Sequence, residues 1–166
     1  MLVVNLSFKH LGEQYSFNLQ LKCGEVHKFE VGERMLADKL FWCLCGLDGD
    51  CQYKINVSGQ NISFKNDILA LGDGTMFLDR SVDKNVYKAL RVRHKRKEAR
   101  QKTSEVMKIY ELESALDVAI ARAHFRNFKL LIVNCFDTYI QNSAQYFDKR
   151  KNHLPKREEL YILEVH

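Results

Sequence analysis

The chain has 166 residues, of which 46% are hydrophobic and 28% are charged. That length allows one domain with its own core and is too short for two comfortable ones. No run approaches the roughly 18 consecutive apolar residues that a membrane-spanning helix needs, and the first residues lack the pattern of a secretory signal. We therefore expect a single domain covering residues 1–166, located in the cytoplasm, whose net charge of +5 mildly favours an acidic partner.

The five cysteines are an odd number and show no spacing typical of a metal site. They are Cys23, Cys43, Cys45, Cys51 and Cys135. Cys43 and Cys45 are two apart on a predicted helix, where such side chains point away from each other. We expect all five to be reduced thiols, most of them buried.

The first part of the chain alternates apolar and polar residues, as half-buried strands do. This pattern predicts strands at residues 3–8, 15–21, 26–31, 51–57 and 68–71. One helix, at residues 35–45, interrupts them, because its apolar residues recur at helical spacing and Gly46 follows as a helix stop.

The second part of the chain is mainly helical. Apolar spacing predicts helices at residues 83–91, 97–110, 115–125 and about 142–151. Two apolar runs, at residues 130–133 and 160–165, indicate buried strands. Strands first and then strand–helix alternation indicate a layered α/β domain with a mixed sheet.

Taken in chain order, several segments resemble an ATP-binding-cassette (ABC) ATPase domain. Residues 24–27 read GEVH where that family commonly has GEI, and the first helix ends in CGL where the family has AGL. Residues 53–62 resemble its G-x-I-x-x-x-G-x-x-I hairpin. Residues 76–86 resemble its LF…TVxEN segment, and residues 119–133 its ALARAL…PKLLLLDEP segment. Residues 161–166 resemble the strand that carries its switch histidine.

The resemblance implies an α/β, P-loop NTPase-like (ABC ATPase-like) fold with a mixed β-sheet and a reduced helical subdomain at about residues 79–125. In the family, this subdomain docks onto a membrane subunit, and two cassettes pair head to tail around nucleotide. The resemblance therefore also implies a protein partner: a transporter's membrane subunit, an active ABC ATPase or a second copy of the chain. A membrane subunit would place the chain at the inner face of a membrane.

ATP binding in this family depends on a phosphate loop of the form G-x-x-x-x-G-K-[ST]. Backbone N–H groups and the lysine hold the phosphates there, and Ser or Thr holds magnesium. Aligned without a gap, Val31 stands at the first glycine, Ala37 at the lysine and Asp38 at the serine. A one-residue shift recovers Gly32 as the first glycine but puts Ala37 at the second glycine and Asp38 at the lysine. Lys39 either reaches a phosphate or is an ordinary surface lysine.

In both alignments Met35 and Leu36 would face the phosphates, and Asp38 would add a negative charge. Unit charges about 4 Å apart repel by several kcal/mol in a partly buried site, whereas micromolar ATP binding is worth only about 8 kcal/mol. We therefore expect this loop not to bind ATP with magnesium.

The other catalytic positions that the resemblance implies are changed as well. Asn134 and Cys135 follow an apolar strand where the family has Asp and Glu, and an amide and a thiol do not replace a magnesium ligand and a base. Asp73 stands at the family's glutamine, and the signature segment is missing from residues 111–118. Only His166 matches, at the switch histidine.

Several polar residues also have simpler interpretations. A solvated side chain is the alternative to a switch role for His166. A buried strand-end thiol is favoured over a nucleophile for Cys135, since no histidine is near it in sequence. Asp48 and Asp50 flank Gly49 as turn residues rather than metal ligands.

A run of lysines and arginines, which we call the basic cluster, contains Glu98 as its only acid. The basic cluster consists of Lys88, Arg91, Arg93, Lys95, Arg96, Lys97, Arg100 and Lys102. One interpretation is a solvated helix pair, a second is contact with phosphates or acidic lipid headgroups, and a third is docking to an acidic coupling helix. No aromatic residue lies within the cluster, and no nucleic-acid-binding motif accompanies it.

From these observations we predict a catalytically inactive ABC-type pseudo-ATPase, with no catalytic residue, cofactor or metal, that acts as a structural or regulatory binding module. The alternative is a nucleic-acid-binding α/β protein that uses residues 88–102. An enzyme of unrelated chemistry ranks third, because the sequence offers no convincing acid–base or nucleophile constellation.

Overall fold

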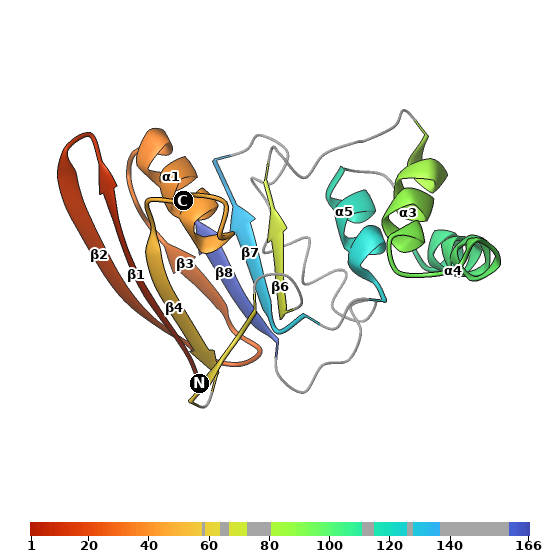
Figure 1. Cartoon of the computed structure of the whole chain (residues 1–166), viewed down its shortest axis with the longest axis horizontal. Helices are drawn as coiled ribbons and strands as arrows, with labels where there is room; N and C mark the ends of the chain where they lie inside the picture. Colours follow the sequence, from red (N-terminus) through yellow and green to blue (C-terminus); the bar gives the residue numbers. More distant parts are fainter. Residues whose placement is uncertain (58, 64–66, 73–80, 111–114, 126–127, 137–159) are drawn as a thin grey trace.

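The computed structural model describes residues 1–57, 59–63, 67–72, 81–110, 115–125, 128–136 and 160–166. Its strands form two four-stranded sheets, one antiparallel and one parallel (Figure 1). One helix lies between the sheets, and three more lie beyond the edge of the parallel sheet. Among the described residues, none of the helices has both the length and the apolar character that crossing a lipid bilayer requires.

The antiparallel sheet has the strand order β2-β1-β4-β5. These strands are β1 (Leu2–His10), β2 (Glu13–Leu21), β4 (Gln52–Val57) and β5 (Gln60–Asn61). Burial alternates along β1, because every second side chain of a strand points to the same face. The inward face of β1 is formed by Leu2, Val4, Leu6 and Phe8. One face of this sheet therefore packs on the core.

The parallel sheet has the strand order β3-β8-β7-β6. Its strands are β3 (Val26–Phe29), β6 (Ile68–Leu71), β7 (Leu130–Asn134) and β8 (Tyr161–Val165). All five residues of β7 and all five of β8 are buried, as expected for central strands covered on both faces. Because all four strands run the same way, their carboxyl ends meet at one edge of the sheet.

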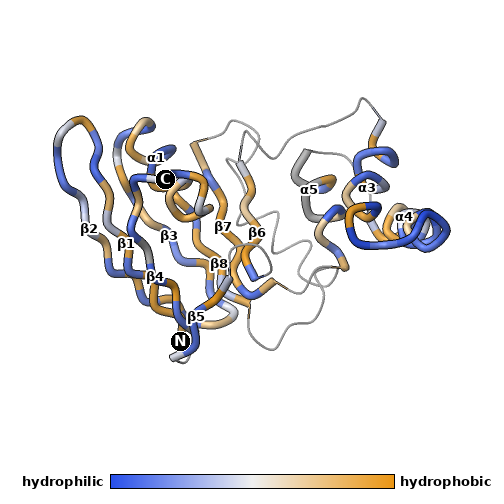
Figure 2. The backbone as a smooth tube through the Cα atoms, viewed as in Figure 1, coloured by the Kyte–Doolittle hydropathy of each residue, from blue (hydrophilic) through white to orange (hydrophobic). Residues whose placement is uncertain are grey.

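Helix α1 (Arg34–Leu44) packs between the two sheets. Its buried side chains include Leu40, Phe41 and Leu44, and these join one core cluster with β1 and with one face of the parallel sheet. Figure 2 shows mainly hydrophobic colouring along β7, whereas β1 and β4 carry both hydrophobic and hydrophilic residues.

Helices α3 (Val82–Arg91), α4 (Arg96–Ile109) and α5 (Ala115–Ala123) form a layer beyond β6 (Figure 1). A second core cluster joins side chains of these helices to the other face of the parallel sheet. It includes Leu71, Val86, Leu90, Ala99, Val106, Ala121, Leu131, Val133 and Ile162. Figure 2 shows that α4 is mostly hydrophilic outside this contact. We call α3–α5 the helical layer.

The predicted α/β fold class is confirmed, and the predicted elements that lie in the described residues agree with the structure to within a few residues. The antiparallel and parallel strands of the expected mixed sheet are divided between two sheets. Residues 60–61, which belong to the segment 53–62 that resembles a hairpin, form the short strand β5. The helix predicted at about residues 142–151 lies outside the described residues.

The prediction of five reduced thiols is wrong for one pair. Cys43 and Cys51 form a disulfide, with their Cα atoms 5.6 Å apart. The turn after α1 brings the end of this helix beside the start of β4, a proximity that sequence spacing did not reveal. Cys135 is buried as predicted, whereas Cys23 is exposed.

Candidate functional site

Four of the positions singled out in the sequence, Asp38, Asn134, Cys135 and His166, lie at the carboxyl edge of the parallel sheet. In open α/β sheets, this edge is where ligands bind. The backbone N–H of Val31 donates to the carbonyl of His166 at 2.6 Å, and the N–H of His166 donates to the carbonyl of Phe29 at 2.9 Å. The N–H of Cys135 donates to the carbonyl of Val165 at 2.8 Å. Segments that follow β3, β7 and β8 are therefore joined at one place.

The loop that should hold phosphates is short, because β3 ends at Phe29 and α1 begins at Arg34. Gly32 has the positive φ angle of 77° that glycine adopts readily. The N–H of Ala37 donates to the carbonyl of Glu33 at 2.9 Å within the first turn of α1. Most positions of the aligned phosphate loop thus lie in a helix, where N–H groups beyond the first turn bond internally and do not face a ligand.

Apart from Gly32 and Arg34, the residues at these positions have apolar or acidic side chains. Ala37, at the family's lysine in the alignment without a gap, is completely buried in the core. Met35 is 60% exposed, but Leu36 is buried. The expectation that both would face phosphates is therefore wrong for Leu36, because the periodicity of α1 turns it into the core between the sheets.

Asp38 and Asn134 contact each other directly across the site. The Nδ2 group of Asn134 donates to Oδ1 of Asp38 at 2.7 Å, and Oδ1 of Asn134 accepts the backbone N–H of Phe136 at 3.2 Å. Arg34 Nε lies 3.8 Å from the Asp38 carboxylate. The hydrogen bond between Asp38 and Asn134 supports the alignment without a gap. That alignment puts these two residues at the positions where the resemblance implies magnesium ligands.

Lys39 is directed away from this edge. Its ammonium group forms an ion pair with the carboxylate of Asp48, in the turn that follows the C-terminal end of α1. Asp48 also accepts the backbone N–H of Asp50 at 3.0 Å, as expected of a turn residue. The hydrogen bonds from Lys39 and from the Asp50 backbone lower the pKa of Asp48. Lys39 is therefore paired with an acid of its own chain in this structure, and a contact with phosphate stays a prediction.

The other face of the same edge carries Cys135, Glu164 and His166. One candidate ligand atom from each residue lies within 4.8 Å of the others. His166 Nε2 is 3.0 Å from Glu164 Oε2, and the His166 side chain is only 28% exposed. His166 is thus not the solvated side chain of the simpler interpretation. Sequence reasoning missed Glu164, although a carboxylate within an apolar strand was a signal for a buried charge.

Two of the sequence-predicted positions remain untested by this geometry. Asp73 and the segment 111–114 lie outside the described residues. The described chain continues with α5 at Ala115.

The basic cluster lies around the turn between α3 and α4. Seven of its eight members are exposed. Lys102 differs, because its Nζ is 3.7 Å from Glu98 and 4.2 Å from the centre of the Phe125 ring. The segment from Asp83 to Ile109 holds ten lysines and arginines against three acids, an excess larger than the net charge of the whole chain. The positive charge of the protein is therefore concentrated on the helical layer.

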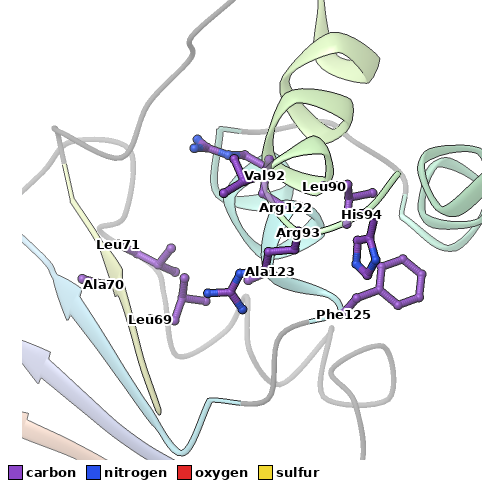
Figure 3. A pocket seen from close by; sticks show the side chains of 11 residues that line it. Leu69, Ala70, Leu71, Leu90, Val92, Arg93, His94, Arg122, Ala123 and Phe125 are labelled. Atoms are coloured by element: carbon purple, nitrogen blue, oxygen red, sulfur yellow. The ribbon is translucent and has the colours of Figure 1, made fainter. Parts of the chain in front are cut away.

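A pocket of about 190 Å³ lies between β6 and the helical layer. Figure 3 shows Leu69 and Leu71 of the strand on one side of it, with His94 and Phe125 on the other. Arg93 and Arg122 also line the pocket, and burial lowers the pKa of Arg122. The pocket thus combines apolar walls with cationic groups, a combination that the sequence did not indicate.

Comparison with known proteins connects this geometry to one fold. Two solved structures of the ATP-binding cassette MJ0796 match: a dimer in a post-hydrolysis state bound to ADP and Pi, and a dimer described as a bacterial ABC transporter cassette. Each has a TM-score of 0.63 and 16% sequence identity, and the match covers 99% of this chain and 87% of the cassette. No protein-family model and no curated protein matches the sequence. The chain therefore has the fold of an ABC ATPase cassette, as the resemblance implied.

Proposed function

We propose that the chain is a catalytically inactive ABC-type pseudo-ATPase that acts as a structural or regulatory binding module. The hydrogen bond between Asn134 and Asp38 is the observation that carries this proposal. It joins the two side chains that stand where magnesium ligands belong in an active cassette. A carboxylate on the loop side and an amide on the strand side leave neither the hydroxyl nor the acid that this chemistry uses.

The backbone around the site supports the same conclusion. The N–H groups of Val31 and Ala37 already donate to the carbonyls of His166 and Glu33. An incoming triphosphate would have to break such bonds, and it would meet the carboxylates of Glu33 and Asp38 near the start of α1. A helix N-terminus favours anions, but carboxylates at this place oppose a further negative charge.

Calorimetry of the full chain with ATP and magnesium tests the inactive site. We expect binding weaker than about 1 mM, equivalent to less than about 4 kcal/mol. An ABC ATPase with a complete phosphate loop, titrated in the same buffer, is the positive control. Magnesium-dependent binding of ATP in the micromolar range by this chain would refute the proposal.

The partner that we propose is a protein, either a transporter's membrane subunit or a second cassette. The exposed basic cluster and the neighbouring pocket support the helical layer as the docking surface. The matched cassettes are described as dimers, so a second copy of this chain also belongs among the candidates. Affinity purification from the native cell identifies the partner, and charge reversal by Arg96→Glu with Arg100→Glu should reduce its recovery. Equal recovery with both forms would exclude the basic cluster as the contact.

A nucleic-acid-binding function is the second candidate, favoured by the same excess of exposed lysines and arginines. Binding to phosphates releases counterions, so any such affinity must fall steeply as salt increases. Titration with single- and double-stranded DNA and RNA at low salt separates the candidates. Absence of binding at low salt would eliminate this alternative.

A further inference from the structure

Cys135, Glu164 and His166 form a compact group of three different metal-ligand types on one face of the parallel sheet. Cys135 directly follows β7, while Glu164 and His166 come from the adjacent strand β8 and its continuation. Residues 164 and 166 point to the same face because side chains alternate along a strand. Cys135 belongs to the core cluster on that face, together with Ile162. Their spacing in sequence forms no known motif, so only the fold brings them together.

The separations between these groups are close to those of zinc ligands. Zinc binds Cys sulfur at about 2.3 Å and His nitrogen or carboxylate oxygen at about 2.0–2.2 Å, which puts tetrahedral ligand atoms about 3.3–3.8 Å apart. Here the three candidate atoms all lie within 4.8 Å of one another, and His166 Nε2 is 3.0 Å from Glu164 Oε2. Small side-chain rotations therefore suffice to place all three around one ion.

The backbone holds the ligand-bearing residues in place before any ion binds. The N–H and carbonyl groups of His166 bond to Phe29 and to Val31, at 2.9 Å and 2.6 Å respectively. The N–H of Cys135 bonds to Val165 at 2.8 Å. A site on fixed strand ends loses little conformational entropy when it takes up a metal, which favours tight binding.

The charges of the group also match a divalent cation. Glu164 is only 1% exposed, and a buried carboxylate needs a compensating charge. His166 provides a partner for it in the structure described here. A divalent ion would balance the Glu164 carboxylate together with a Cys135 thiolate, leaving a neutral site with a neutral imidazole.

We propose that Cys135, Glu164 and His166 form a mononuclear zinc site at the carboxyl edge of the parallel sheet. A thiolate and an imidazole select zinc over the hard ion magnesium. Three protein ligands leave one coordination position for water or a small anion, reached past the partly exposed His166. This inference does not depend on the proposed pseudo-ATPase function, because its test contains no nucleotide.

Cobalt(II) titration of the full chain, metal-depleted and kept reduced with a phosphine, tests the site directly. We expect one cobalt ion per chain and a thiolate-to-cobalt charge-transfer absorption, which zinc then removes by displacement. Binding of zinc requires loss of the thiol proton, so its affinity should rise with pH. Absence of the charge-transfer band, or no saturable uptake, would overturn the proposal.

Substitutions show which residues hold the ion. Cys135→Ser should abolish the charge-transfer band. His166→Ala should weaken zinc binding by more than the roughly 10- to 100-fold that loss of a supporting outer group costs. Cys51→Ser is the matched control, because Cys43, Asp48 and Cys51 form the other candidate group among the described residues, and their thiols are available after reduction. Loss of the band in Cys51→Ser with retention in Cys135→Ser would contradict the assignment.

Glu164 is buried, so its replacement carries a risk of misfolding that the experiment must separate from loss of a ligand. Glu164→Gln keeps the shape of the side chain, and its circular dichroism should match the unmodified chain. Zinc should raise the thermal unfolding midpoint of the unmodified chain and of Cys51→Ser, but not that of Cys135→Ser, because only a folded-state site gives this shift. Equal shifts in all forms would show that these residues do not bind the ion.

Discussion

The two charged regions of this molecule differ in how their charges are satisfied. At the carboxyl edge of the parallel sheet, Asp38 bonds to Asn134 and Glu164 pairs with His166. On the helical layer, seven of the eight residues of the basic cluster are exposed to solvent. The first region lies at the end of the parallel sheet, whereas the second lies on α3, α4 and the turn between them, and Figure 1 shows these helices beyond the edge strand β6.

The sheet edge, where an ABC cassette has its catalytic groups, and the helical layer, which carries most of the positive charge, are therefore different parts of the molecule. At the edge where an ABC cassette would bind nucleotide, Asp38 is bonded to Asn134 and Glu164 is paired with His166, and carboxylates oppose an anionic ligand. The exposed cations of the helical layer keep a field that attracts an acidic surface. The comparison therefore supports the proposed role in partner binding, and substitutions in each region test it separately.

The largest effect is expected from the packing beneath the edge. Phe41 of α1 is 1% exposed, and a Cβ added to Gly72 at the end of β6 would lie only 2.8 Å from its ring. Phe41→Ala should cost about 3–5 kcal/mol of unfolding free energy, because the lost contacts leave a cavity. Met35→Ala, on the exposed side of the same helix, should change it by no more than about 0.5 kcal/mol. Urea unfolding measures both free energies. Equal losses in the two variants would show that the packing of Phe41 does not support the sheet edge.

The disulfide gives the next largest effect, since it ties the end of α1 to β4. Closing a loop between residues eight apart should stabilise the chain by about 2–3 kcal/mol. A reductant should therefore lower the urea midpoint of the unmodified chain and leave that of Cys51→Ser unchanged. If reductant leaves the urea midpoint of the unmodified chain unchanged, the disulfide is ruled out.

The thiol of Cys45 lies outside this disulfide. Burial raises the pKa of Cys45 to about 12, so this thiol should react slowly with alkylating reagents.

Introducing an acid at the end of β7 tests whether the polar groups of the sheet edge are satisfied by one another. Asn134→Asp would put a second carboxylate beside Asp38, in place of a hydrogen bond of 2.7 Å. We expect a loss of about 1–3 kcal/mol at pH 7, as for other unsatisfied buried groups.

The pH dependence of that loss has a definite sign. A neighbouring carboxylate raises the folded-state pKa of the introduced carboxyl above its unfolded value. The penalty is therefore complete above the raised pKa and disappears as the pH falls below the unfolded one. Asn134→Ala, which loses the hydrogen bond without adding a charge, should show no such dependence. Parallel pH profiles for both variants in chemical unfolding would contradict close contact at residue 38.

The sequence predicted the local elements well because their patterns are local. Alternation in β1 and helical spacing in α1 each depend on a few neighbouring residues, and both elements occur as expected. The pairing of strands is not local. Nothing in the spacing of apolar residues showed that β1 pairs with β4 while β3 pairs with β8, and so the division into two sheets was not foreseen.

The candidate site was predictable in its positions but not in its contacts. The resemblance pointed to Asp38 and Asn134, but their hydrogen bond joins residues 96 apart in sequence. The grouping of Cys135 with His166 likewise depends on β7 and β8 being neighbours. Glu164 escaped notice because a single charge in an apolar strand has no motif, although its burial sets a strong demand for a counter-charge.

The smallest effect on stability, and a large one on binding, is expected from the helical layer. Arg96→Glu with Arg100→Glu should change the unfolding free energy by no more than about 0.5 kcal/mol, because both side chains are exposed. Binding of the captured partner should weaken, and its dependence on salt should become shallower, since fewer cations then contribute to the attraction.

Lys9→Glu with Lys54→Glu makes the same change of charge on the exposed side chains of β1 and β4 and is the matched control. Surface plasmon resonance at low and physiological salt measures both pairs. If the two pairs of substitutions weaken binding equally, net charge alone drives the association. If only Arg96→Glu with Arg100→Glu weakens it, the partner contacts the helical layer, as we expect from the exposed cations there.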